Sequence, residues 1–169
     1  MDEYVKLAKY SVENYVKTRK IAKLYDNIPE EMLFQQAGVF VSLKKNGDLR
    51  GCIGTISPTK DSIAEEILEI AVTAAVGDLR FDPVKESELG EIVYSVDVLS
   101  PPEPIRSKEL LDQNIYGVIV TCGIKRGLLL PNLEGVDSVE EQISIALRKA
   151  GIRPDEDYHL QRFKVVRHK

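Results

Sequence analysis

The stretch DLRGCIGTI, residues 48–56, places an arginine and a thiol two positions apart in a segment typical of a β-strand. Side chains at that spacing lie on one face roughly 7 Å apart, so the guanidinium of Arg50 can favour the thiolate form of Cys52. The glycines on either side of the thiol would leave room for a ligand. The stretch predicts a reactive cysteine. The alternative is a packed core residue, because free cysteine is among the most buried residue types.

The register of the hairpin that contains this stretch decides where Cys52 points, because a slip of one residue moves every side chain to the other face. A two-residue turn at Asn46-Gly47 would pair Val41 with Cys52 and mix Arg50 into the apolar face. A three-residue loop over residues 45–47 keeps that charge out of the core. Burying an unpaired charge costs several kcal/mol, so we predict the three-residue loop.

The predicted register has two structural consequences. It pairs Val41 with Gly51 and Val39 with Ile53 across antiparallel strands. It also places Cys52 beside Arg50, Ser42 and Phe40, away from the main apolar stripe.

The whole chain predicts an α+β fold with helices and mainly antiparallel sheets. Apolar periodicity indicates an amphipathic helix over residues 2–23, and capping residues indicate helices over 62–77 and 138–151. Residues 116–133 are typical of a second hairpin, and single strands are expected over 91–100 and 158–166.

The order hairpin, helix, strand therefore occurs twice. The sequences GVFVS and GVIVT begin the two hairpins, and SIAEEI and SVEEQI begin the two helices. This similarity predicts a duplicated β-β-α-β unit, residues 38–99 and 117–166, forming two intimate subdomains. Chance similarity between short β-branched strands and capping boxes is the alternative.

Composition argues against several classes of function. The chain has 169 residues, two cysteines and a formal net charge of −4, which opposes binding to nucleic acid or an anionic membrane. It has no apolar run long enough to span a membrane and no signal peptide, so we expect a cytoplasmic protein with reduced thiols. No phosphate-binding loop, dinucleotide motif or metal-ligand spacing is present, so we expect no cofactor and no metal.

A second segment, AAVGDLRFDPVKESEL, lies in the loop after the second predicted helix, and VDVLSPPEPI and GLLLPNLEGV follow it. Together with LRGCIGTI, these motifs resemble the AMMECR domain family over nearly the whole chain. The resemblance implies one AMMECR-like domain over residues 1–169, with an intracellular α+β fold of two subdomains. A tryptophan expected near the last helix is absent, which affects the packing expected there.

The resemblance also implies a site. The signature positions supply Asp78 and Arg80 beside Cys52 and Arg50 as candidate catalytic residues. Candidate binding residues are Gly51, Ile53, Gly54, Thr55 and Phe81. If the Asp78 loop folds over the Cys52 face, two guanidinium groups converge near one thiol, a setting suited to a small anionic ligand.

Three functions follow from these residues. The first is an enzyme in which Cys52 acts on an anionic substrate held by Arg50 and Arg80. The second is a binding or scaffold module for pathway partners, which the resemblance implies are Memo-like and radical S-adenosylmethionine proteins. Nucleic-acid binding is a distant third. No histidine lies beside the thiol motif to act as a base, which argues against a Cys-His hydrolase.

Overall fold

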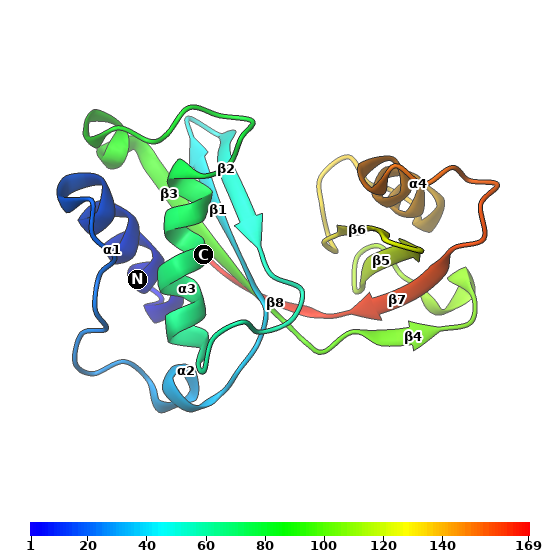
Figure 1. The fold of residues 1–169 in the computed structure, drawn as a ribbon, viewed down its shortest axis with the longest axis horizontal. Helices are drawn as coiled ribbons and strands as arrows, with labels where there is room; N and C mark the ends of the chain where they lie inside the picture. The colour runs from blue at the N-terminus through cyan, green and yellow to red at the C-terminus, as the bar shows by residue number, and fades with distance from the viewer. The chain divides into compact units, whose positions relative to one another are not determined.

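The computed structural model describes residues 1–169, which divide into two compact units (Figure 1). Unit 1 comprises residues 1–99 and 166–169, and unit 2 comprises residues 100–165. Each unit has one four-stranded sheet, and every strand pair whose register is described is antiparallel. The α+β class with antiparallel sheets is therefore confirmed.

The sheet of unit 1 has the strand order β2-β1-β3-β8. Its strands are β1 (Val39–Lys45), β2 (Asp48–Gly54), β3 (Ile92–Leu99) and β8 (Val165–His168). Alternation along β1 buries Val39, Val41 and Leu43 completely and leaves the residues between them on the opposite face. Strand β2 is an edge strand, so the thiol motif lies at the border of the sheet.

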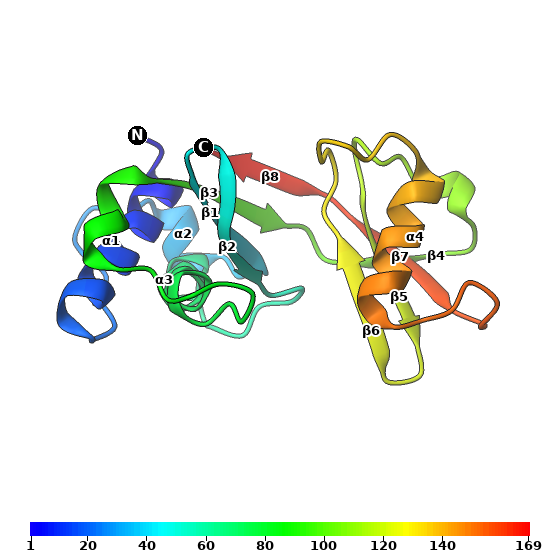
Figure 2. The same cartoon turned by 90° about the horizontal axis from the view of Figure 1, so that it is seen from above.

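Helices cover only one face of this sheet within unit 1 (Figures 1 and 2). Helix α3 (Ile63–Val76) packs on β1 and β2, and α1 (Glu3–Thr18) packs on α3 and β3. Short helices α2 (Glu30–Phe34) and η1 (Glu86–Glu91) complete the unit. No helix of the structure is long and apolar enough to cross a membrane.

The helix boundaries follow the predicted caps, with one exception. The Ser62 side chain accepts a hydrogen bond from the Glu65 amide at the start of α3, and Gly77 ends this helix. Helix α1 ends at Thr18 instead of residue 23, because Arg19 adopts a left-handed conformation with φ of 63°. Arginine carries no sequence signal for that conformation.

The predicted hairpin register is wrong. Asn46 and Gly47 both have positive φ and form a two-residue turn, and a β-bulge follows in β2 with Arg50 as its extra residue. Val41 consequently pairs with Ile53, and Leu43 pairs with Gly51. Because of the bulge, the hairpin has the common two-residue turn and still keeps its apolar side chains on one face. Neither of the two predicted registers includes this bulge.

The sheet of unit 2 has the order β4-β7-β5-β6, and α4 (Val139–Ala150) covers β5 and β6. The remaining elements are β4 (Glu103–Ile105), η2 (Lys108–Leu110), β5 (Gly117–Cys122), β6 (Lys125–Leu129) and β7 (His159–Phe163). Ser138 caps α4 at its start, and Gly151, with φ of 71°, ends it as predicted.

The single strand predicted over residues 158–166 is two strands. Strand β7 belongs to the sheet of unit 2, whereas β8 belongs to the sheet of unit 1. In both units a hairpin, a helix and a third strand follow in the same order, and the third strand pairs with the first strand of the hairpin. The shared order agrees with a duplication, and superposition of residues 38–99 on 117–166 stays a prediction.

Candidate functional site

Cys52 lies on the face of β2 that no helix of unit 1 covers. Its partner across the hairpin is Ser42, and the Cys52 Sγ is 3.2 Å from the Ser42 Oγ. Both side chains are partly buried. The prediction that Cys52 lies beside Ser42 and away from the apolar stripe is confirmed, although the register that led to it is wrong.

The outer edge of β2 is closed at Cys52 by the loop that follows α3. The Cys52 amide donates a hydrogen bond of 3.0 Å to the Asp78 carboxylate, whose side chain is only 5% exposed. Nη2 of Arg80 donates to the Cys52 carbonyl oxygen at 3.3 Å. Two loop side chains thus take the place of a neighbouring strand at this residue.

Asp78 and Arg80 are also bonded to each other. Nε and Nη2 of Arg80 contact the two carboxylate oxygens at 3.0 and 2.8 Å. The Arg80 hydrogen bond, followed by those from backbone amides, holds the pKa of Asp78 well below its usual range. Asp78 is therefore a carboxylate at neutral pH and not a proton donor.

The Arg80 guanidinium interacts electrostatically with the Cys52 thiol. The hydrogen bond to Asp78 is the main cause that raises the Arg80 pKa, and the charge of Cys52 raises it further. An interaction between charges is mutual, so Arg80 favours the Cys52 thiolate. The Arg80 side chain is 59% exposed, and its Nη1 has no protein partner, so this edge of the guanidinium can bind an anion.

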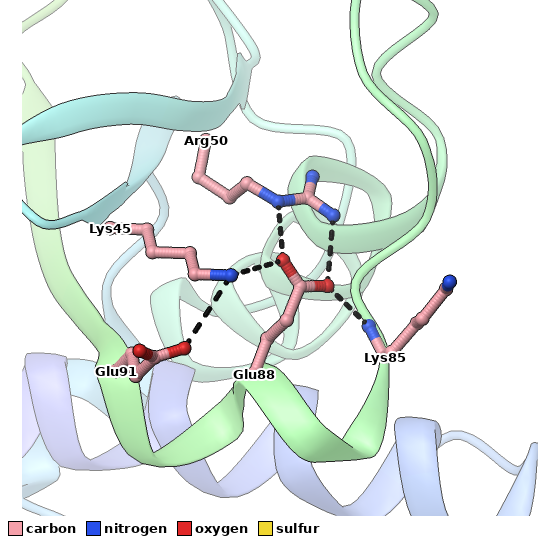
Figure 3. A network of polar contacts seen from close by, with 5 residues as sticks. All are labelled: Lys45, Arg50, Lys85, Glu88 and Glu91. Atoms are coloured by element: carbon pink, nitrogen blue, oxygen red, sulfur yellow. Dashed lines mark hydrogen bonds and ion pairs between the residues drawn. The ribbon is translucent and has the colours of Figure 1, made fainter.

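The arginine of the thiol motif has a different partner. Figure 3 shows Arg50 from β2 pointing toward Glu88 of η1. Nε and Nη2 of Arg50 donate to the two Glu88 carboxylate oxygens at 3.0 and 3.1 Å. The Arg50 side chain is 14% exposed, and its Nη1 is buried without a protein partner. Each arginine thus bonds its own carboxylate, and the convergence of both guanidinium groups near the thiol stays a prediction.

Glu88 is the centre of a network that fastens η1 to the hairpin (Figure 3). It accepts hydrogen bonds from the Lys45 ammonium at 3.1 Å and the Lys85 amide at 2.8 Å, and Lys45 also contacts Glu91. The Arg50 hydrogen bond, followed by those from Lys85 and Lys45, lowers the pKa of Glu88 to about 2. Arg50 thus has a structural role in positioning the β2 bulge.

The glycines beside Cys52 do not leave room for a ligand. A Cβ on Gly51 would lie 2.1 Å from the Ala74 carbonyl oxygen of α3, and one on Gly54 would lie 2.0 Å from the Phe40 ring. Gly51 therefore permits close approach of the helix, and Gly54 accommodates an aromatic side chain. The expectation of open space at these positions is wrong.

The other predicted binding residues have mixed positions. Ile53 packs against the core of unit 1, and Thr55 continues the strand pairing through contacts with the Val39 backbone. Phe81 lies beside the candidate site, with its ring centroid 5.4 Å from the Arg80 guanidinium. Of this set, only Phe81 adds to the surface around Arg80.

Two important residues carried weak sequence signals. Ser42 interrupts an apolar strand, and strand alternation alone explains a polar residue at that position. Glu88 lies within the segment AAVGDLRFDPVKESEL, where nothing distinguishes it from the neighbouring acidic residue Glu86. The structure contains no cluster of His, Cys, Asp or Glu side chains that could hold a metal ion. His168 bonds Asp2 and stacks on Tyr4, so it is not a base for Cys52.

Comparisons with known proteins agree on one family. The AMMECR1 family model matches residues 5–168. A Thermotoga maritima protein is 52% identical over 98% of this chain and 97% of its own length. A Clostridium acetobutylicum protein is 56% identical over 99% of this chain, which spans 36% of that protein.

A solved structure has the same fold. The crystal structure of an uncharacterised Pyrococcus horikoshii protein matches with a TM-score of 0.91 and 34% sequence identity. The match covers 97% of this chain and 88% of the other.

Proposed function

The chain belongs to the AMMECR1 family, and we propose that it is an enzyme in which Cys52 attacks a small anionic substrate held by Arg80. The observation that carries the proposal is the attachment of Arg80 to both Asp78 and the Cys52 carbonyl, with one edge of the guanidinium left open. A cytoplasmic location, in which both cysteines stay reduced, is part of the proposal.

The chemistry begins from a thiolate that exists before the substrate binds. No histidine contacts Cys52, so a neighbouring charge, and not a general base, has to favour the deprotonated sulfur. The sulfur then forms a bond to an electrophilic carbon of the substrate, and the leaving group departs with its electron pair. Asp78 holds Arg80 in place through two contacts and stays charged throughout.

Two alkylating agents of similar size test the anion site directly. Iodoacetate carries a carboxylate and iodoacetamide does not, so Arg80 should favour the first. We expect the iodoacetate rate divided by the iodoacetamide rate to be about tenfold higher at Cys52 than for free cysteine in solution. This is the size of effect that one charge-assisted contact implies. Mass spectrometry after reaction of the native protein would measure both adducts, with Cys122 as the internal reference.

Arg80→Met should remove this selectivity. Arg126→Met is the matched control, because Arg126 is an exposed arginine on the edge strand of unit 2. Equal selectivity in all three proteins would contradict an anion site at Arg80. If Cys52 stays unmodified in the native protein and Cys52→Ser only lowers stability, the nucleophile is wrong and a binding module remains.

A specific observation favours that second candidate. Leu79, between Asp78 and Arg80, is completely exposed and lies beside the candidate site, in a segment fixed by hydrogen bonds. A partner protein could cover it, and Memo-like and radical S-adenosylmethionine proteins are the proposed classes. Leu79→Asp should then weaken binding to purified partners of these classes in a titration, while Cys52 alkylation stays unchanged.

A further inference from the structure

Ser42 is a polar side chain in direct contact with the Cys52 thiol. It lies on β1 between Val41 and Leu43, which are both fully buried on the opposite face. Its hydroxyl is 3.2 Å from the Cys52 Sγ, and no other hydrogen-bond partner of this hydroxyl is found in the protein. The sulfur is therefore the protein group with which this hydroxyl interacts.

The backbone explains why the two side chains come so close. In an antiparallel pair, residues whose N–H and C=O groups point away from the partner strand have their side chains nearest to each other. The N–H and C=O of Cys52 point outward, to Asp78 and Arg80. Ser42 and Cys52 thus form such a pair, and the loop after α3 fixes the geometry from the other side.

The hydroxyl can serve either protonation state of the sulfur. A serine hydroxyl rotates freely and both donates and accepts hydrogen bonds, whereas a thiolate only accepts them. We infer that Ser42 is a positioning residue that donates its hydroxyl hydrogen to the Cys52 thiolate and aims the sulfur at the substrate. The inference rests on the proposed function, because it concerns the same nucleophile.

The corresponding pair in unit 2 is different. The segments GVFVS and GVIVT align Ser42 with Thr121, and Thr121 pairs with Arg126 on the edge strand β6. The hydroxyl-thiol pair is consequently not required to build this type of hairpin. Its presence in unit 1 alone, where Arg80 also lies, supports a chemical role.

The test is the pH profile of Cys52 alkylation by iodoacetamide, which reports the thiolate fraction. We expect Ser42→Ala to move the midpoint upward and to slow alkylation below it about tenfold. Ser42→Thr, which keeps the hydroxyl, should restore most of the rate. Ser95→Ala is the matched control, because Ser95 pairs with Ser42 from β3, on the opposite side of β1 from the strand that carries Cys52.

The outcomes separate the two proposals. In one outcome, the alkylation midpoint of the native protein lies below that of an ordinary thiol and is unchanged in Ser42→Ala. This result would overturn the role of Ser42 and leave the nucleophile intact. An ordinary midpoint in the native protein would overturn both proposals. A purely structural role would lower the thermal stability of Ser42→Ala without moving the midpoint, so melting curves complete the experiment.

Discussion

Arg50 and Arg80 each bond a carboxylate of this protein, although the sequence predicts that both bind an anionic substrate. Glu88 receives Arg50, and Asp78 receives Arg80. The difference between them is exposure: Arg50 is largely buried, whereas most of Arg80 is open to solvent. At the scale of single residues, the first arginine is therefore structural and the second is available for a ligand.

Glu88 should make the protein sensitive to acid. Its folded pKa of about 2 lies below the ordinary value of 4.5, so its stabilisation is present above pH 4.5 and is lost as the pH falls toward 2. We expect Glu88→Gln to lower the free energy of unfolding at pH 7 by about 1–3 kcal/mol and to flatten its decline between these pH values. Urea titrations at several pH values would measure this.

Glu91 provides the control for that prediction. Its side chain is 52% exposed, and its ion-pair partner is Lys45. Exposed pairs of this kind contribute little, so Glu91→Gln should change the stability by less than about 1 kcal/mol at any pH. An acid profile of Glu88→Gln that parallels the unaltered protein would show that Glu88 is not a main source of acid sensitivity.

At the scale of elements, the contact between β2 and α3 depends on one glycine. Because a Cβ at residue 51 would lie 2.1 Å from the Ala74 carbonyl oxygen, Gly51→Ala must separate the strand from the helix. We expect a loss of about 3 kcal/mol or more in the free energy of unfolding. Chemical denaturation followed by circular dichroism would measure it.

Gly90 is the matched glycine in unit 1. A Cβ there would meet no atom within 4 Å, and its φ is not in the left-handed region. Gly90→Ala should therefore change the stability by less than about 0.5 kcal/mol. Equal losses at both positions would contradict the steric explanation for Gly51.

Helix caps and strand alternation made the element types predictable, whereas the site geometry was not. Ser62 and Gly77 bound α3 as their chemistry predicts. The bulge at Arg50 has no comparable sequence signal. It depends on the whole hairpin, because the preferred turn geometry and the burial of one apolar face have to be satisfied together. The partner of Arg50 was also unpredictable, since Glu88 lies far along the chain and tertiary structure alone brings them together.

At the scale of the whole molecule, residues 166–169 complete unit 1 although unit 2 precedes them in the sequence. Arg167 contacts the buried Asp97 at 2.7 Å, and His168 contacts Asp2 at 2.8 Å. These contacts fix β8 beside β3 and attach it to the start of α1. Residues 166–169 are thus an integral part of unit 1.

Removing residues 166–169 should destabilise unit 1 selectively. The deletion leaves the Asp97 carboxylate, which is 3% exposed, without its Arg167 partner, and we expect a loss of about 3 kcal/mol. Hydrogen exchange should show faster exchange in α1 and β3 and unchanged protection in α4 and β5. Deleting Lys169 alone is the control and should change neither unit, and a uniform loss of protection would contradict the prediction.

The position of β8 also has a consequence for protein synthesis. A ribosome adds roughly 5–20 residues per second, so the segment between Leu99 and Val166 separates the third and fourth strands of unit 1 by roughly 3–13 s. All four strands of unit 2 are made before β8 is made. While unit 2 is being made, the nascent chain consequently exposes the β3 edge and the Asp97 carboxylate. The sheet of unit 1 is complete only when β8 pairs with β3.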